Sequence, residues 1–320
     1  MTTPSSPQIS VIVCTFNRCE MLRQTLHSIL SQELDGRLQL ELIVVDNNST
    51  DQTRTVVQGI AAQAPWPVTY CFEPTPGLSR ARNLGVREAL GTWVLFTDDD
   101  IAPNPRWVSS VYNAFQREQA DGVCGPILPL WESSPPSWVM PLSQGPFSMT
   151  YGEETFLITS RRHPFFGANM AYRRQTLLQL GGFRNDLGLC GSRRLLGEDT
   201  EFFQRAVDAG KRLVYEPEAA VSHYVRRVQL TRSYFRHWKY LEGYSIARYH
   251  APSSPTRRLV FGIPLWALRE AVVGGCLVAK SYLFAGLEEA FRQELKWWVH
   301  LGYARGLGEV ARQERTGARA

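Results

Sequence analysis

A short apolar segment that ends in three consecutive acids is the strongest constraint in this sequence. Residues 92–97 read Thr-Trp-Val-Leu-Phe-Thr, a run typical of a strand that is covered on both faces. Asp98, Asp99 and Asp100 follow without a break. Side chains alternate along an extended chain, so we expect Asp98 and Asp100 to point to one side and Asp99 to the other.

The run of aspartates indicates a bound cation. Adjacent carboxylates repel each other, and hard cations such as Mg2+ or Mn2+ take carboxylate ligands that they often share with phosphate oxygens. The alternative is a solvated acidic turn before a helix that starts at Asn104-Pro105. This segment alone leaves both interpretations open.

Strands and helices alternate through the first part of the chain. Apolar strands are predicted at residues 9–14, 41–45, 68–73 and 92–97. Such an order is typical of a mostly parallel α/β sheet with right-handed crossovers, in which ligands bind outside the carboxyl ends of the strands. Polar clusters follow three of these strands, at residues 15–18, 46–51 and 98–100. We therefore expect the three clusters to share one edge of the sheet.

Local signals place the remaining polar residues. Ser49 and Gln52 have the spacing of a capping box, which predicts a helix that starts there and runs to about residue 64. Asp199 lies where a helix that ends at Gly210 is expected to begin, and His223 directly follows a strand predicted at residues 219–222. No glycine-rich dinucleotide fingerprint or P-loop follows the first strand, so the sequence argues against both of those folds.

Charge is unevenly shared along the chain of 320 residues. Residues 1–225 hold 19 Lys/Arg and 23 Asp/Glu, a net charge of −4, whereas residues 226–320 hold 16 and 7, a net charge of +9. A basic last third favours an anionic partner, either a membrane surface or a phosphate-bearing substrate. No recognised nucleic-acid motif accompanies this charge, and we expect no nucleic-acid partner.

The cysteines and the N-terminus indicate a cytoplasmic protein. The six cysteines are scattered without a CxxC pair, as is usual for reduced thiols, and the first residues lack the basic and apolar parts of a signal peptide. Residues 259–287 are apolar but interrupted by charges, and the longest uncharged run, 259–268, is too short to cross a bilayer. Helices that pack or lie on a surface fit this pattern better.

Five motifs in order resemble those of family 2 glycosyltransferases, which are inverting, nucleotide-sugar-dependent enzymes of the GT-A fold. They read Val-Ile-Val-Cys-Thr-Phe-Asn-Arg, Leu-Ile-Val-Val-Asp-Asn-Asn-Ser-Thr-Asp, Ser-Arg-Ala-Arg-Asn-Leu-Gly, Phe-Thr-Asp-Asp-Asp and Gly-Glu-Asp-Thr-Glu. The resemblance implies a GT-A-type catalytic domain over residues 1–225, with a nucleotide-sugar part at about 8–127 and an acceptor part at about 128–225. A basic helical region over 226–320 would follow.

The resemblance also implies the residues that bind the donor. These are Thr15, Asn17, Arg18, Asp46, Arg82, Asn83, Asp98 and Asp99. Asp46 would accept hydrogen bonds from the base, and Arg82 would reach the diphosphate. The alternatives are turn and cap chemistry for the Asn and Asp side chains, and a solvated helix face for Arg82.

A metal site and a catalytic base follow from the same resemblance. Asp100 would be the direct ligand of Mn2+ or Mg2+, with Asp98 nearer the ribose and His223 as a third ligand. A lone histidine is often structural, so that alternative stays open for His223. Asp199 would be the general base, with Glu198 next in line, unless Asp199 only caps its helix. Residues 167–170, Gly-Ala-Asn-Met, resemble the acceptor-side loop of the family.

We therefore expect an inverting glycosyltransferase that moves a sugar from a nucleotide-diphosphate sugar to an acceptor hydroxyl, in cell-surface polysaccharide or glycolipid assembly. The acceptor would be a saccharide or a lipid-linked one. The alternatives are a nucleotidyltransferase and a non-catalytic nucleotide-binding scaffold of the same fold. For residues 226–320 we weigh a peripheral contact with the anionic inner face of the plasma membrane against packing on the catalytic domain or pairing of two subunits.

Overall fold

The computed structural model describes residues 6–34, 38–190, 193–249, 259–260 and 263–316. The chain divides into two compact units. The first unit comprises Met1–Ser133, Ser143–Gly191 and Glu198–Val225, and the second comprises Ser134–Leu142, Ser192–Gly197 and Arg226–Ala320.

The first unit is built on an eight-stranded sheet with the order β3-β2-β1-β4-β9-β6-β12-β8. Its strands are β1 Ile9–Thr15, β2 Leu40–Asp46, β3 Val68–Phe72, β4 Trp93–Asp98, β6 Gly122–Cys124, β8 Phe156–Ile158, β9 Met170–Arg173 and β12 Leu213–Tyr215. The four strands at one end are mutually parallel, and β9 runs antiparallel to both β4 and β6. The prediction of a mostly parallel α/β sheet of the GT-A type is confirmed.

The register of the central strands aligns the polar residues at their ends. Thr15 lies opposite Asp46 on β2, and Cys14 lies opposite Asp98 on β4. The strands are buried up to these residues because helices cover both faces of the sheet. The predicted common edge for the three polar clusters is therefore confirmed.

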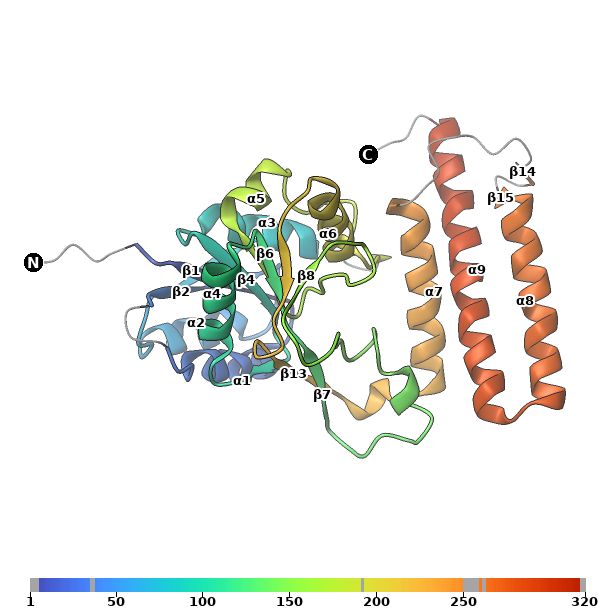
Figure 1. The fold of residues 1–320 in the computed structure, drawn as a ribbon, viewed down its shortest axis with the longest axis horizontal. Helices are drawn as coiled ribbons and strands as arrows, with labels where there is room; N and C mark the ends of the chain where they lie inside the picture. The colour runs from blue at the N-terminus through green and yellow to red at the C-terminus, as the bar shows by residue number, and fades with distance from the viewer. Residues whose placement is uncertain (1–5, 35–37, 191–192, 250–258, 261–262, 317–320) are drawn as a thin grey trace, which may run out of the picture. The chain divides into compact units, whose positions relative to one another are not determined.

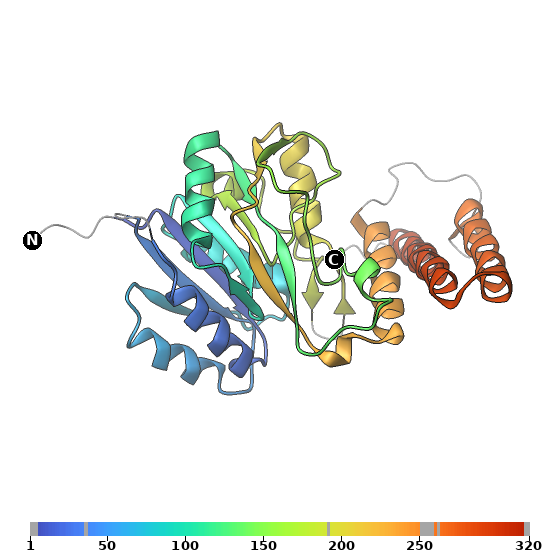
Figure 2. The ribbon, with the colours of Figure 1, turned by 60° about the horizontal axis from the view of Figure 1, so that its bottom comes forward.

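Six helices accompany this sheet: α1 Cys19–Leu30, α2 Thr53–Ala61, α3 Leu78–Glu88, α4 Trp107–Glu118, α5 Arg174–Gln179 and α6 Glu198–Asp208. Figures 1 and 2 show α1 and α2 on one face and α3, α5 and α6 on the other. The start of α4 is tied to the segment that follows α1, since the Val108 N–H donates to Gln32 Oε1. Two predicted helix starts are wrong by a few residues: α2 begins at Thr53 rather than at Ser49, and α4 begins at Trp107 rather than at Pro105.

A second, three-stranded sheet brings a late part of the chain to the aspartates. It consists of β5 Ile101–Pro103, β13 Val221–Val225 and β7 Ile127–Trp131, with β13 in the middle. The short strand β10, Leu189–Cys190, also belongs to the first unit. His223 lies opposite Ile101, and the Tyr224 N–H donates to the Asp100 carbonyl. The expected strand at 219–222 is thus shifted, because β13 contains His223 instead of ending before it.

The second unit is helical in its C-terminal part, as expected. Its elements are η1 Met140–Leu142, β11 Arg193–Arg194, η2 Arg227–Gln229, α7 Arg232–Tyr249, β14 Leu259–Val260, β15 Ile263–Pro264, α8 Leu265–Phe284 and α9 Leu287–Thr316. Helix α9 packs between α7 and α8 (Figure 1). Gly243 and Gly302 permit the close approach of α7 and α9, because a Cβ at either position would overlap the backbone of the other helix. In the described part of the chain, no helix is both long and apolar enough to span a membrane.

Candidate active site

The three aspartates at the end of β4 have different surroundings. Strand β4 ends at Asp98, and the next two residues form a turn. Asp99 is buried and accepts hydrogen bonds from Thr15 Oγ1 at 2.7 Å and from Arg18 Nη1 at 2.9 Å. The same Arg18 nitrogen lies 3.0 Å from Asp100 Oδ2. The expected strict alternation is wrong because the turn lets Arg18 bind both Asp99 and Asp100.

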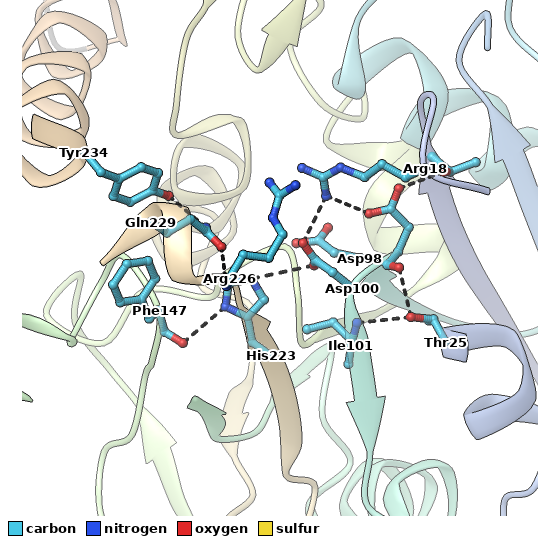
Figure 3. Close-up of polar contacts among 12 residues, drawn as sticks. Arg18, Thr25, Asp98, Asp100, Ile101, Phe147, His223, Arg226, Gln229 and Tyr234 are labelled. Atoms are coloured by element: carbon cyan, nitrogen blue, oxygen red, sulfur yellow. Dashed lines mark hydrogen bonds and ion pairs between the residues drawn. The ribbon is translucent and has the colours of Figure 1, made fainter. Parts of the chain in front are cut away.

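His223 completes this group from the second sheet. Its Nε2 lies 3.6 Å from Asp100 Oδ1, and its Nδ1 lies 3.3 Å from the Phe147 carbonyl oxygen (Figure 3). Burial disfavours the imidazolium, but the neighbouring Asp100 carboxylate, with smaller effects of Asp98 and the Phe147 carbonyl, raises the pKa of His223. Asp100 and His223 therefore face each other across a gap that is wider than a direct hydrogen bond.

The acids at this edge are crowded. Burial raises the pKa of Asp99 to about 6 although Arg18 attracts the charged form. Loss of water around Asp98, together with repulsion from Asp100, also raises the pKa of that carboxyl against the attraction of Arg82. A divalent cation would relieve this repulsion, and carboxylate oxygens with an imidazole nitrogen suit Mn2+. In the described residues no three His, Cys, Asp or Glu side chains are grouped so that they could hold a metal ion by themselves.

The loops after β1 and β2 are fastened to each other. Asn17 has a φ of 52°, and its Oδ1 accepts a hydrogen bond from the Thr50 N–H at 2.7 Å. Ser49 Oγ accepts a hydrogen bond from the Asn17 N–H, which is why Ser49 does not begin the helix. Asp51 fixes the start of α2 instead, since its Oδ1 accepts from the N–H of Thr53, the first residue of the helix.

Asp46 lies at the bottom of these loops and is buried. Its Oδ1 accepts from the Ser49 N–H, and its Oδ2 accepts from the Tyr70 hydroxyl, each at 2.8 Å. Burial and the neighbouring Asp46 carboxylate raise the pKa of Tyr70 to about 12, so the phenol stays a donor. The sequence interpretation missed Tyr70, because an alternating strand does not indicate which side chain reaches the next strand.

Asn47 is a second residue that the sequence interpretation missed. Its Nδ2 donates to the carbonyl oxygens of Glu73 and Thr75, and its Oδ1 accepts from the Gly77 N–H at 2.7 Å. This one amide holds the loop between β3 and α3. A buried Asn in the polar run after β2 was the available signal.

Arg82 is the centre of a buried ion-pair network. Only 3% of this residue is exposed, and its Nη1 lies 2.6 Å from Glu198 Oε1 while its Nη2 lies 3.5 Å from Asp98 Oδ1. The alternative of a solvated helix face is wrong. Arg82 connects the end of β4 with the first residue of α6, and the two acids raise the pKa of its guanidinium against the effect of burial.

Glu198 and Asp199 are adjacent but differ in environment. Burial and repulsion from Asp199 raise the pKa of Glu198 to about 7 although Arg82 attracts its charge. Asp199 is half-buried, and its two oxygens accept hydrogen bonds from the backbone N–H groups of Gly167 at 2.7 Å and Thr200 at 2.6 Å. Since α6 begins at Glu198, Asp199 lies inside its first turn and is not the N-cap residue.

Gly167 lies between these groups. A Cβ at this position would overlap the Arg82 guanidinium, so only glycine fits while Arg82 keeps its ion pairs. The same residue donates its N–H to Asp199 Oδ2. Three segments distant in sequence therefore meet at Arg82: the aspartate cluster, the loop at Gly167 and the start of α6.

The structure does not bring the Asn83 amide into this group. Its Nδ2 donates to the Phe183 carbonyl oxygen at 2.8 Å, and its Oδ1 accepts from the Phe183 N–H at 2.9 Å. Asn83 thereby fastens the chain that follows α5. Apart from Asn83, the residues expected to bind donor or metal lie in the two connected groups around Arg18 and Arg82 or in the loops after β1 and β2.

Comparisons with known proteins agree with this arrangement. The family model described as glycosyl transferase family 2 matches residues 10–181. The succinoglycan biosynthesis protein ExoM of Rhizobium meliloti is 27% identical over 312 residues, which cover 97% of this chain and 96% of that protein. The glucosyl-dolichyl phosphate glucuronosyltransferase of Haloferax volcanii is 25% identical over 250 residues, 74% of this chain and 76% of that protein.

A solved structure has the same fold. The mannosyltransferase PcManGT from Pyrobaculum calidifontis, in complex with GDP-Man and Mn2+, superposes with a TM-score of 0.56. The match covers 99% of this chain and 77% of that chain, at 20% sequence identity. At this identity the likeness supports the GT-A fold and not a particular substrate.

Proposed function

Because the chain belongs to glycosyltransferase family 2, we propose that it transfers a sugar from a nucleotide-diphosphate sugar to an acceptor hydroxyl with inversion. One observation carries this proposal. Arg82 joins Asp98, at the end of β4, to Glu198, and the next residue is the partly accessible carboxylate of Asp199. One buried guanidinium thus holds a donor-side acid and the residue that precedes the candidate base.

The nucleoside would lie on the loops after β1 and β2. Asp46, Thr15 and Asn17 end or follow the two adjacent strands, and each loop is already held in shape by hydrogen bonds. The second lone pairs on the Asp46 oxygens can accept from a base N–H. Which base and which sugar the donor carries stays open.

Asp100, Asp98 and His223 would hold Mn2+ or Mg2+, with donor phosphate oxygens as the remaining ligands. The cation would neutralise negative charge on the leaving diphosphate. Arg18 holds Asp100 in position, and its side chain is 40% exposed, so it can also contact a phosphate.

Asp199 would act as the general base. The acceptor oxygen forms a bond to the anomeric carbon while the bond from that carbon to the phosphate oxygen breaks, and the acceptor proton passes to Asp199. The N–H groups of Gly167 and Thr200 fix the orientation of the carboxylate without consuming all of its lone pairs.

We place the reaction in cell-surface polysaccharide or glycolipid assembly, because the relatives named above act in succinoglycan biosynthesis and on a dolichyl phosphate-linked sugar. The acceptor would then be a saccharide or a lipid-linked sugar. The cytoplasmic location stays a prediction, and cell fractionation would test it.

The test is release of nucleoside diphosphate from a panel of nucleotide sugars, with and without Mn2+. Asp100→Ala should abolish the metal-dependent turnover and the metal-dependent part of nucleotide binding while the fold is retained. Glu154→Ala, an exposed acid, is the matched control and should behave like the wild type. Full turnover in EDTA would refute the metal site, and no turnover with any donor would favour a non-catalytic scaffold.

A further inference from the structure

One face of α8 carries large apolar side chains that are exposed. The opposite face packs on α9, where Ala267 is buried and Trp297 Nε1 donates to the Ala271 carbonyl oxygen at 2.6 Å. The large exposed apolar side chains on this face are Leu265, Trp266, Val272, Val273, Leu277, Leu283 and Phe284. Tyr282 is also exposed but lies outside this face, and its hydroxyl donates to Glu294 of α9. Leu283 and Phe284 are 75% and 81% exposed, so this face has no counterpart among the described residues.

The exposed residues form one continuous stripe. An α-helix turns about 100° per residue, which places all seven within roughly 140° of the helix circumference. We name this stripe the α8 face. Arg269 and Lys280 are exposed and lie eleven residues, about three turns, apart, so both project from the middle of the stripe. Glu270 falls at its margin.

The two cations argue against a second copy of the chain as the partner. In a two-fold antiparallel pairing of α8 faces, Arg269 of one helix would come close to Lys280 of the other, twice over. Four cations would then be buried, with only the Glu270 carboxylate of each copy nearby at the margin of the stripe. An uncompensated buried charge is strongly destabilising. Apolar side chains around two central cations suit a surface that offers both an apolar layer and anionic groups.

We propose that the α8 face docks on an anionic lipid surface. Apolar side chains would enter the headgroup zone, while the long stems of Arg269 and Lys280 lie along it and bring their charges to lipid phosphates. The net charge of +9 over residues 226–320 adds long-range attraction to such a surface. The purpose, access to a lipid-linked acceptor, rests on the proposed function, but the docking itself does not.

Flotation of the full-length protein with vesicles tests the proposal. Binding is expected to phosphatidylcholine vesicles that contain phosphatidylglycerol, to be weaker without it, and to fall in high salt. Arg269→Gln with Lys280→Gln should weaken binding about 25-fold, since each basic residue near the surface contributes about fivefold. Arg87→Gln with Arg162→Gln removes the same charge from exposed sites of the first unit and should leave binding nearly unchanged.

A second variant separates the apolar contribution. Leu283→Ser with Phe284→Ser keeps every charge and should abolish flotation, with circular dichroism showing unchanged helix content. If the wild type stays with the soluble fraction at low salt, or if the serine variant instead dissociates a dimer in sedimentation analysis, the proposal is wrong. Neither the flotation nor the sedimentation measurement needs a sugar donor or an acceptor. Both therefore test the docking even if the transferase assay fails.

Discussion

At the scale of single residues, Asp199 offers the sharpest test of the chemistry. Both of its oxygens accept backbone N–H groups, so Asp199→Asn keeps the size and one of these two hydrogen bonds but removes the base. We expect turnover to fall by roughly 100-fold or more while donor affinity survives. Steady-state kinetics and nucleotide titration measure the two quantities separately. Unchanged turnover would assign the base elsewhere, with Glu198 next to be tested.

Gly167 tests the network around Arg82. In Gly167→Ala the new Cβ overlaps the guanidinium, so Arg82 must move from Glu198 and Asp98. We expect a loss of stability of about 1–3 kcal/mol from overpacking. The rate constant should fall more than donor affinity, because the Gly167 N–H also orients Asp199.

The control for that substitution is Gly59→Ala in α2. A Cβ at Gly59 meets nothing within 4 Å, and alanine is favoured over glycine inside a helix. We expect this variant to gain about 0.5–1 kcal/mol and to keep full activity. Equal behaviour of the two alanine variants in urea unfolding would contradict the steric account of Gly167.

At the scale of elements, Asp51 connects the beginnings of two helices. Its Oδ2 accepts from the Cys19 N–H at the start of α1, and its Oδ1 accepts from the Thr53 N–H at the start of α2. Removing a helix cap costs about 1 kcal/mol. We therefore expect Asp51→Ala to lower the free energy of unfolding near neutral pH by at least that amount, as measured in urea.

The pH dependence of this contribution has a definite sign. Partial burial raises the pKa of Asp51, but the hydrogen bonds from Thr53 and Cys19 outweigh it and lower the pKa below the ordinary 3.8. The stabilisation is therefore present above that value and is lost as the pH falls through the lowered pKa. Wild type and Asp51→Ala should converge in acid. Asp51→Asn should retain one of the two backbone hydrogen bonds at neutral pH but lose this titration.

At the scale of the whole molecule, the two units have separate hydrophobic cores. One cluster lies among residues of the first unit, and Ala247, Ala267, Ala304 and Leu307 form another in the second. We expect calorimetry to resolve two transitions. A nucleoside diphosphate with Mn2+ should raise the free energy of unfolding of the first unit alone, by about 2.7 kcal/mol at a hundredfold excess over Kd. Only the transition temperature of that unit should therefore increase.

Asp100→Ala is the control for this experiment and should lose the part of the shift that requires Mn2+. A single transition that moves as a whole with ligand would contradict independent units. It would also count against the predicted boundary near residue 225, which stays a proposal.

Local sequence was sufficient for the four parallel strands at one end of the sheet and for the position of the site. The alternation of apolar strands with amphipathic helices, and polar clusters after three strands, follow from periodicities of a few residues. They correctly predicted that Thr15, Asp46 and Asp98 share an edge. The family resemblance was confirmed as well, because it rests on the motifs at those strand ends.

Only the tertiary structure decided how the side chains pair. Arg82 pairs with Glu198, which lies 116 residues later in the chain, and Asn17 bonds to Thr50, which lies 33 residues later. At such separations no local pattern distinguishes a side chain with a buried partner from one on a solvated helix face. The start of α2 differs from the prediction for the same reason: Ser49 binds the Asn17 N–H, and the helix begins at Thr53, whose N–H donates to Asp51. In α8, spacing predicts a stripe, but only packing on α9 determines which face of the helix remains exposed.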